Sequence, residues 1–340
     1  PSEYMDVALY TGNGSTQTIS GLNFSPDFVW IKERSQSIND HILKTSLQTR
    51  FLSSNGSVAE RGSSGDLITS LDSTGFTVNT TYLGGSSNSS TNGLNVSYAS
   101  WAWDAGSSTV TNNDGTITSQ VRANTSAGFS IVTYTGNGSA GATIGHGLGA
   151  APQMIIVKTR NAARNWTVGH QGIASDPWTD YLMLNSTAAA ADLNTVWNDT
   201  APTSSVFTVG TANGVNANTE THVAYCFAPV DGYSSFGSYT GNGSTDGPFV
   251  YTGFRPRWLL YKNTAANNNW VLIDTSRDPV NVCAQYLYAN SAQAEATYGV
   301  FDFLSNGFKA RTGDVQTNLA SNTYIYAAFA EHPFQSSRAR

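Results

Sequence analysis

Three short apolar runs stand far apart in the chain and share one pattern. Residues 28–31, 154–157 and 258–261 are aromatic, β-branched or otherwise apolar throughout, and each run is followed directly by a lysine. Short continuous apolar runs closed by a charge are typical of buried β-strands. We therefore predict a strand at each of these places.

Helical patterning is weak by comparison. No window of the sequence keeps an apolar period of 3.6 residues. The best helical candidate is the alanine-rich stretch 186–193, where we expect a single turn or a short helix. The pattern as a whole predicts an all-β chain.

The apolar runs belong to a longer repeat. The string Tyr-Thr-Gly-Asn-Gly-Ser begins at Tyr10, Tyr134 and Tyr239, and a proline, the apolar run and its lysine follow each copy in the same order. Each copy ends in an aromatic-rich strand pattern, at 98–103, 222–227 and 324–329. Self-similarity over about a hundred residues indicates an array of equivalent domains. We expect three tandem repeated β-sandwich units of the lectin or jelly-roll kind.

The predicted units are residues 1–105, 129–230 and 231–340. Residues 106–128 are rich in Gly, Ser, Thr and Asn, which indicates a linker or a hairpin arm. The connection between the second and third units is short. We therefore expect those two units to share a packed contact and the first unit to hinge.

The Asn-Gly pair inside the repeated string predicts a tight turn, because both residues tolerate positive φ angles. With the serine that follows it, this pair matches the N-glycosylation sequon Asn-Gly-Ser. Such sequons arise by chance in a chain this rich in Asn, Ser and Thr. We interpret the pair as structural in all three copies. The predicted turn residues are Asn13, Gly14, Asn137, Gly138, Asn242 and Gly243.

Charge and composition narrow the function. The net charge is −6 and no basic run occurs, which argues against nucleic acid as a partner. No apolar stretch approaches the length of a membrane-spanning helix, so we expect no membrane insertion. Cys226 and Cys283 fall at different places in the repeat, and we predict two buried free thiols.

Candidate catalytic groups are sparse. No two histidines or cysteines have metal-ligand spacing, and His146 lies in a glycine-rich turn that no other copy contains. Glu60 and Glu295 each stand five residues after a repeated Asn, but the second unit has no acid there. We predict no catalytic residue, no metal site and no cofactor.

Tryptophans divide into two groups. Trp166 and Trp270 occupy matching positions in the repeat, which predicts core packing. Trp178 and Trp197 are specific to the second unit, so we expect exposed rings that stack on sugars. The predicted ligand-binding residues are these two tryptophans and Asn267, Asn268 and Asn269.

Several segments together resemble a known family. They are Phe24-Ser-Pro-Asp-Phe-Val-Trp-Ile-Lys32, Ile144-Gly-His-Gly-Leu-Gly-Ala-Ala-Pro-Gln-Met-Ile-Ile-Val-Lys158 and the closing Tyr324-Ile-Tyr-Ala-Ala-Phe-Ala330. This combination is similar to an uncharacterised repeat domain family of bacteriophage tail, tail-fibre and other virion structural proteins, many from marine phages. The resemblance covers nearly the whole chain.

The resemblance implies a non-enzymatic structural protein on the virion surface, made in the host cytoplasm, in a tail fibre, a tail tip or a capsid decoration. Implied partners are further copies of the chain, as a trimer by analogy with phage fibres, other virion proteins and host surface polysaccharide. Two alternatives remain open. One is a soluble carbohydrate-binding, lectin-like protein, and the less favoured one is a glycan depolymerase.

Overall fold

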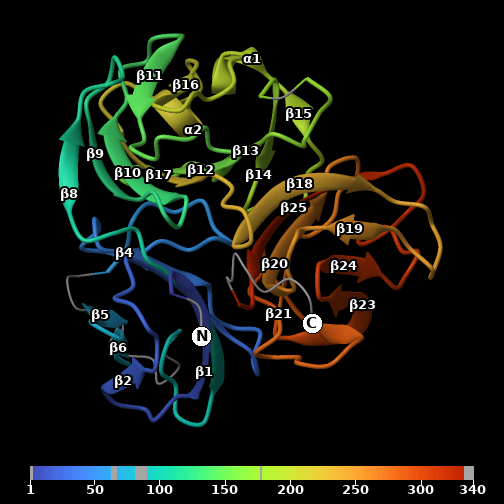
Figure 1. The fold of residues 1–340 in the computed structure, drawn as a ribbon. Helices are drawn as coiled ribbons and strands as arrows, with labels where there is room; N and C mark the ends of the chain where they lie inside the picture. Colours follow the sequence, from blue (N-terminus) through green and yellow to red (C-terminus); the bar gives the residue numbers. More distant parts are fainter. Residues whose placement is uncertain (1–2, 63–66, 81–89, 177, 333–340) are drawn as a thin grey trace.

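The computed structural model describes residues 3–62, 67–80, 90–176 and 178–332. Strands hold 44% of the residues and helices 3%, so the all-β prediction is confirmed. Figure 1 shows three lobes that meet at the middle of the molecule. We call them lobe 1 (3–105), lobe 2 (106–230) and lobe 3 (231–332).

The strands follow in chain order. Lobe 1 contains β1 (Met5–Thr11), β2 (Gln17–Ser20), β3 (Phe28–Glu33), β4 (Ile42–Thr45), β5 (Ile68–Asp72), β6 (Gly75–Val78) and β7 (Ser97–Trp103). Lobe 2 contains β8 (Thr109–Asn112), β9 (Ser119–Asn124), β10 (Phe129–Thr135), β11 (Ala142–Gly145), β12 (Met154–Thr159), β13 (Thr167–His170), β14 (Asp180–Met183), β15 (Ala191–Asp192), α1 (Asn194–Trp197), β16 (Val206–Val209), α2 (Asn213–Asn216) and β17 (Thr221–Phe227). Lobe 3 contains β18 (Ser234–Thr240), β19 (Phe249–Tyr251), β20 (Pro256–Asn263), β21 (Val271–Asp274), β22 (Cys283–Tyr288), β23 (Ala296–Leu304), β24 (Gly307–Ala310) and β25 (Thr323–Ala330).

One strand order occurs in all three lobes. The sheets contain the runs β1-β7-β3-β4, β10-β17-β12-β13 and β18-β25-β20-β21, and every pair within these runs is antiparallel. The smaller pairings β2-β6 and β11-β16 form separate sheets, whereas β19-β24 continues the large sheet of lobe 3. Residues 106–128, the predicted linker or hairpin arm, contain β8 and β9, which extend the sheet of lobe 2 beyond β10.

Side chains along the three predicted strands alternate between two cores. In β3, Phe28 and Trp30 lie in a central cluster shared by all three lobes, while Val29 and Ile31 lie in the cluster of lobe 1. The same division occurs along β12 and β20. Successive side chains of a strand point to opposite faces of its sheet, so a strand buried on both faces has a continuous apolar run.

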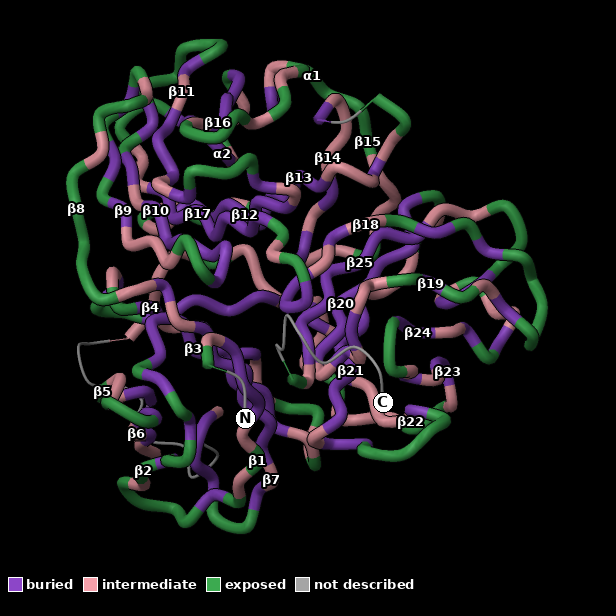
Figure 2. Tube along the Cα trace, viewed as in Figure 1, coloured by how far each residue is buried: buried purple, intermediate pink, exposed green. Residues whose placement is uncertain are grey.

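The shared central core is aromatic. Phe28 stacks on Trp103 of its own lobe and on Tyr225 of lobe 2, with ring centroids 5.2 and 4.7 Å apart. Trp103 also meets Trp258 of lobe 3 edge-on at 5.4 Å. Figure 2 shows the buried trace concentrated where the lobes converge. The expectation that the first unit hinges is therefore wrong, because its sheet forms one side of this common core.

The repeated string closes the outer end of each lobe. A buried asparagine lies opposite each copy, at Asn92, Asn216 and Asn318. Its Oδ1 accepts a bond from the backbone N–H of Asn13 (3.0 Å), Asn137 (2.9 Å) or Asn242 (2.9 Å). Positive φ falls on the following glycine, at +74° in Gly14, +70° in Gly138 and +72° in Gly243.

The first glycine and the tyrosine of the string also have defined roles. A Cβ at Gly12, Gly136 or Gly241 would collide with a backbone carbonyl oxygen of the facing segment in the same lobe. The hydroxyls donate from Tyr10 to Thr91 O, from Tyr134 to Val215 O and from Tyr239 to Thr317 O, at 2.6 to 2.7 Å. The string is thus one half of a buried hydrogen-bonded closure.

Ring nitrogens join neighbouring lobes at all three boundaries. The bonds are Trp166 Nε1 to Ser53 O (2.9 Å), Trp270 Nε1 to Met183 O (3.0 Å) and His41 Nε2 to Tyr288 O (2.9 Å). They run from lobe 2 to lobe 1, from lobe 3 to lobe 2 and from lobe 1 to lobe 3, so they close a ring. The core prediction for Trp166 and Trp270 is confirmed, since both are buried.

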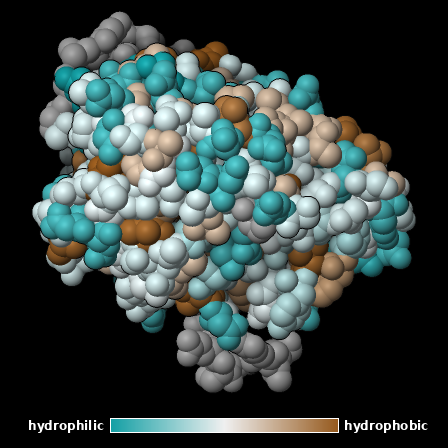
Figure 3. Space-filling view, turned by 90° about the horizontal axis from the view of Figure 1, so that it is seen from above, coloured by the Kyte–Doolittle hydropathy of each residue, from teal (hydrophilic) through white to brown (hydrophobic). Residues whose placement is uncertain are grey.

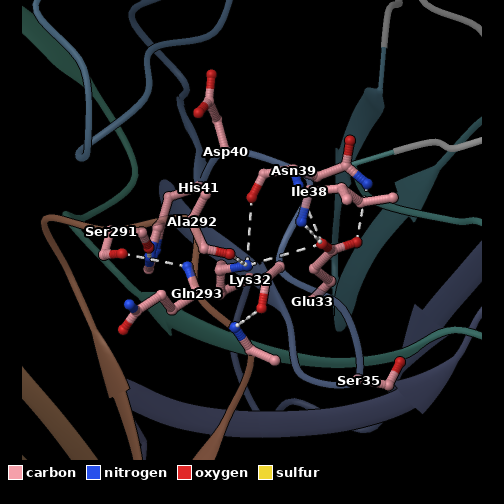
Figure 4. Close-up of polar contacts among 12 residues, drawn as sticks. Lys32, Glu33, Ser35, Ile38, Asn39, Asp40, His41, Ser291, Ala292 and Gln293 are labelled. Carbon is pink, nitrogen blue, oxygen red and sulfur yellow. Dashed lines mark hydrogen bonds and ion pairs between the residues drawn. The ribbon is translucent and has the colours of Figure 1, made fainter.

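Buried lysines reinforce two of these boundaries. Lys32 Nζ donates to Ala292 O of lobe 3 at 2.9 Å (Figure 4), and Lys158 Nζ donates to Ser57 O of lobe 1 at 3.1 Å. Lys262 bonds within its own lobe, to Ala266 O. Burial lowers the pKa of each lysine to about 8.

Each boundary between lobes also has a backbone hydrogen bond at an equivalent place, but only two of these places carry an ion pair. The bonds are Glu60 N to Arg160 O (2.7 Å), Glu295 N to Arg34 O (2.8 Å) and Ala190 N to Thr264 O (2.8 Å). The first two carry ion pairs, Arg160–Glu60 at 2.5 Å and Arg34–Glu295 at 2.7 Å. The boundary between lobes 2 and 3 has an alanine and a threonine instead.

The helix expected at 186–193 is wrong. Thr187 accepts a backbone bond from Asn268, and Ala190 donates one to Thr264, so this stretch is held extended against lobe 3. The short helix α1 begins only at Asn194. Tertiary hydrogen bonds have overridden the helix propensity of alanine.

We predict that Asn216→Ala lowers the free energy of unfolding by about 1–3 kcal/mol, because it removes a buried amide that bonds to the N–H of Asn137 and to the carbonyls of Ser139 and Gly210. Urea denaturation measures the loss. The matched control Asn218→Ala removes an exposed side chain two residues away and should change stability by less than about 0.5 kcal/mol. Equal losses in both variants would contradict the closure.

Acid should weaken the fold through its buried histidines. Burial lowers the pKa of His41 to about 3, and of His170 and His222 to about 4, so the folded state stays unprotonated while the unfolded chain binds protons below about pH 6.5. The neutral histidines contribute fully to the free energy of unfolding above pH 6.5, and this contribution is lost as the pH falls toward 4. The slope is about 1.4 kcal/mol per pH unit for each histidine.

Urea titrations at pH 7, 6, 5 and 4 test this linkage. His41→Gln should reduce the slope by about one proton's worth, because glutamine stays neutral over this range. Stability that does not change between pH 6.5 and 4.5 would contradict the assignment of neutral buried histidines.

Candidate functional site

A groove of about 290 Å³ opens on lobe 3 beside β22 and β23. The loop between β24 and β25 forms its other side. The lining residues are Asn268, Tyr286, Tyr288, Tyr298, Val300, Asp314, Val315, Gln316 and Thr317. Three tyrosines from two paired strands therefore face one small opening.

Strand alternation positions two of the tyrosines. Leu287 is buried in the shared central core, so Tyr286 and Tyr288 on either side of it point to the opposite face of β22. Their ring centroids are 5.2 Å apart and the ring planes are inclined by 50°. Tyr298 comes from the neighbouring strand β23 and is 53% exposed.

The polar groups of the groove are partly committed. Asp314 Oδ1 accepts from the backbone N–H groups of Gln316 and Thr317, each at 2.9 Å, and Oδ2 accepts from the Thr312 hydroxyl at 2.7 Å. These bonds fix the loop. The Gln316 amide and the Tyr288 hydroxyl lie 3.4 Å apart, a long contact that leaves capacity for a ligand.

The boundary between lobes 1 and 3 holds this site in place. His41 of lobe 1 bonds to the carbonyl of Tyr288, and Trp30 Nε1 donates to His41 Nδ1 at 2.8 Å, which leaves Nε2 to carry the proton. This bond fixes the backbone of β22, while the rings of Tyr286 and Tyr288 lie partly buried against the core of lobe 3.

The hydroxyl of Tyr286 stays protonated at neutral pH. Partial burial raises the pKa of Tyr286 to about 12, with further contributions from Tyr288 and Asp314. Its hydroxyl can therefore donate as well as accept a hydrogen bond.

In lobe 2, a helix and two tryptophans occupy the position that corresponds to the groove beside β22. Helix α1 contacts β14, which occupies the position of β22 in the strand order, and Trp197 of this helix is buried in the core of lobe 2. Trp178 meets Trp197 edge-on at 5.5 Å. A helix and two tryptophans thus cover in lobe 2 what is open in lobe 3.

The prediction of exposed rings at Trp178 and Trp197 is therefore wrong. Their side chains are 4% and 1% exposed. Gly169 of β13 provides the room, since a Cβ there would lie 2.4 Å from the Trp178 ring and 2.7 Å from the Trp197 ring. The rings are specific to lobe 2 because they fill its core.

The three predicted asparagines have different places. Asn267 Oδ1 accepts from Ala189 N at 3.1 Å, across the boundary with lobe 2. Asn269 bonds to the Asn290 amide at 2.8 Å. Asn268 lines the tyrosine groove, and its amide makes a long 3.5 Å contact to Val315 O.

The other chemistry-bearing residues support the structure. Glu60 and Glu295 form ion pairs between lobes. His146 Nδ1 accepts from Leu148 N of its own turn, and its Nε2 bonds to Thr203 O in the loop before β16. The two cysteines are free and buried, as predicted. Among residues 3–62, 67–80, 90–176 and 178–332, no His, Cys, Asp and Glu cluster could hold a metal ion. Within the same ranges, no helix has the length and apolar character needed to span a membrane.

A second, wider cleft of about 1010 Å³ lies between lobe 1 and the β8-β9 hairpin. Arg122 on its wall pairs with Asp27 at 2.6 Å, and Asp104 accepts from Gly106 N at 2.6 Å and from the Asn124 amide at 3.1 Å. Its charged walls therefore hold the hairpin against lobe 1.

Sequence reasoning missed the groove tyrosines. A signal was present in Tyr286-Leu-Tyr288, where the middle leucine matches a repeated core position and the flanking tyrosines must face the other way. Tyr298 gave no such signal, because the sequence does not indicate that β23 pairs with β22.

Comparison with known protein families gives a match over almost the whole chain. A family model described as a domain of unknown function, DUF7483, matches residues 1–333. No curated protein and no solved structure matches the chain. Since the model covers almost the entire length, the chain belongs to the DUF7483 family.

Proposed function

We propose that this chain is a non-enzymatic structural protein of the bacteriophage virion surface, and that lobe 3 contacts host surface polysaccharide. In this proposal the lobes are three tandem copies of one β-sandwich unit. The common strand order and the equivalent bonds at the three boundaries support that reading. The virion setting is supported by the resemblance of the sequence segments quoted above.

One observation carries the proposal. Most recurring polar and aromatic groups are bonded inside the structure, but the tyrosines specific to lobe 3 line an open groove. The polar and aromatic groups that recur in all lobes form the hydrogen bonds around the repeated string and between the lobes. This arrangement suits a rigid structural protein. The tyrosines of lobe 3 face an open groove instead. An aromatic ring beside amide and hydroxyl groups is a typical carbohydrate contact.

The less favoured alternative, a glycan depolymerase, fits this groove poorly. A glycosidase uses two carboxyl groups about 5–10 Å apart. Asp314 is the single carboxylate among the groove's lining residues, and both of its oxygens hold the loop. A soluble lectin outside any virion would use the same groove, so location distinguishes it from the proposed function.

Assembly follows from the setting. Further copies of the chain and other virion proteins are the proposed partners, and a symmetric homo-oligomer, a trimer by analogy with fibres, would present several grooves at once. Such multivalency raises avidity without a strong single site.

Mass spectrometry and cryo-electron microscopy of purified virions whose genome encodes the chain test this function. We expect the chain in every particle at a fixed copy number, with three-lobed density in a fibre, a tail tip or a capsid decoration. Its absence from purified particles, with presence in the lysate, would overturn the virion role and favour the free lectin.

A further inference from the structure

The tyrosine groove has the size of a short carbohydrate site. Its volume of about 290 Å³ lies near the lower limit of small-molecule pockets, which suits about one or two sugar rings. Two of its lining residues, Tyr298 and Val315, are exposed to solvent, so the end or a side branch of a longer chain can enter. The interior of a stiff polymer would need a longer channel.

Tyr298 offers the stacking surface. It is more than half exposed, and its hydroxyl is held by the Thr312 hydroxyl at 3.1 Å. One anchored end reduces the freedom of the ring before a ligand arrives, which lowers the entropic cost of binding. The face of a phenol ring packs against the C–H face of a pyranose.

Hydrogen-bonding groups lie around that surface. The amides of Asn268 and Gln316 each make only one or two contacts of 3.4 to 3.5 Å, which are weak by geometry. An amide provides two donors and an acceptor, so both side chains can bond to sugar hydroxyls. The hydroxyls of Tyr286 and Tyr288 add two more groups of either role.

Charge decides between classes of sugar. Asp314 is the one charged side chain among the lining residues, and no cation of the lining set faces it. A carboxylate or sulfate on the ligand would meet this negative charge at close range without a partner. The net charge of −6 adds repulsion at longer range.

We propose that the groove binds a neutral pyranose at the end or on a side branch of a surface polysaccharide and rejects uronic, sialylated and sulfated sugars. This inference rests on the polysaccharide contact in the proposed function. Tyr298 provides the stacking face, and Asn268 and Gln316 select the hydroxyl pattern.

Binding measurements on the purified full chain test the proposal. The probes are neutral glucan, galactan and mannan fragments and, as acidic probes, alginate and polysialic acid fragments, immobilised at equal density. We expect saturable binding to at least one neutral probe and none to the acidic ones. Tyr298→Ala should weaken binding at least tenfold, whereas Tyr298→Phe keeps the ring face and should lose less than threefold.

Tyr251→Ala is the matched control. Tyr251 is 62% exposed in the same lobe, on β19, and does not line the groove. Its removal should leave binding unchanged. Thermal unfolding of each variant verifies that the fold is intact.

A second variant tests the charge argument by gain of binding. Val315 is exposed at the rim, and Val315→Lys places a cation beside Asp314. We expect this variant to acquire measurable binding to alginate or polysialic acid that 0.5 M salt abolishes. The neutral-sugar preference is overturned if the unmodified chain binds the acidic probes as well as the neutral ones.

The site assignment is overturned if neutral probes bind equally to the chain and to Tyr298→Ala. A chain present in virions that binds neither class of probe overturns this inference and the polysaccharide contact but leaves the virion role standing. A chain absent from virions that binds neutral probes through Tyr298 overturns the virion role alone.

Discussion

Burial of both faces of β3, β12 and β20 is the constraint on which the rest of the structure depends. Each strand sends alternate side chains into its own lobe and into an aromatic core shared by all three lobes. The void left at the centre is only about 20 Å³ and its lining is apolar, so the three sheets meet closely. Removing one lobe would expose large aromatic faces of the other two.

Polar contacts around this core determine how the lobes are oriented. At each boundary a ring N–H group and a backbone N–H group bond to carbonyls across it, in opposite directions, so all three boundaries are bonded from both sides. Two boundaries add an arginine–glutamate pair, and at the third Ala190 and Thr264 stand at the equivalent positions. One of these bonds, from His41, fixes the carbonyl of Tyr288, so the contact between lobes 1 and 3 also positions the tyrosine groove. The face seen in Figure 3 is mostly of intermediate hydropathy, with hydrophilic areas and separate hydrophobic spots.

The sequence predicts much of this fold from local pattern. The apolar runs identify the central strands, and the recurrence of Trp166 and Trp270 predicts their burial. Recurrence cannot reveal which partner a residue meets. Glu60 and Glu295 stand out in the sequence, but the sequence does not show that each pairs with an arginine of a neighbouring lobe. Arg160 lies about a hundred residues from Glu60, and Arg34 lies more than two hundred residues from Glu295. The aromatics specific to lobe 2 misled the site prediction, because Trp178 and Trp197 fill the core of that lobe.

Differential scanning calorimetry of the full chain measures most directly whether the shared core makes the three lobes one cooperative unit. The account predicts a single transition in which the calorimetric and van't Hoff enthalpies agree, because no lobe can leave the central core without exposing the others. Two or three separable transitions, with a van't Hoff enthalpy well below the calorimetric one, would contradict it.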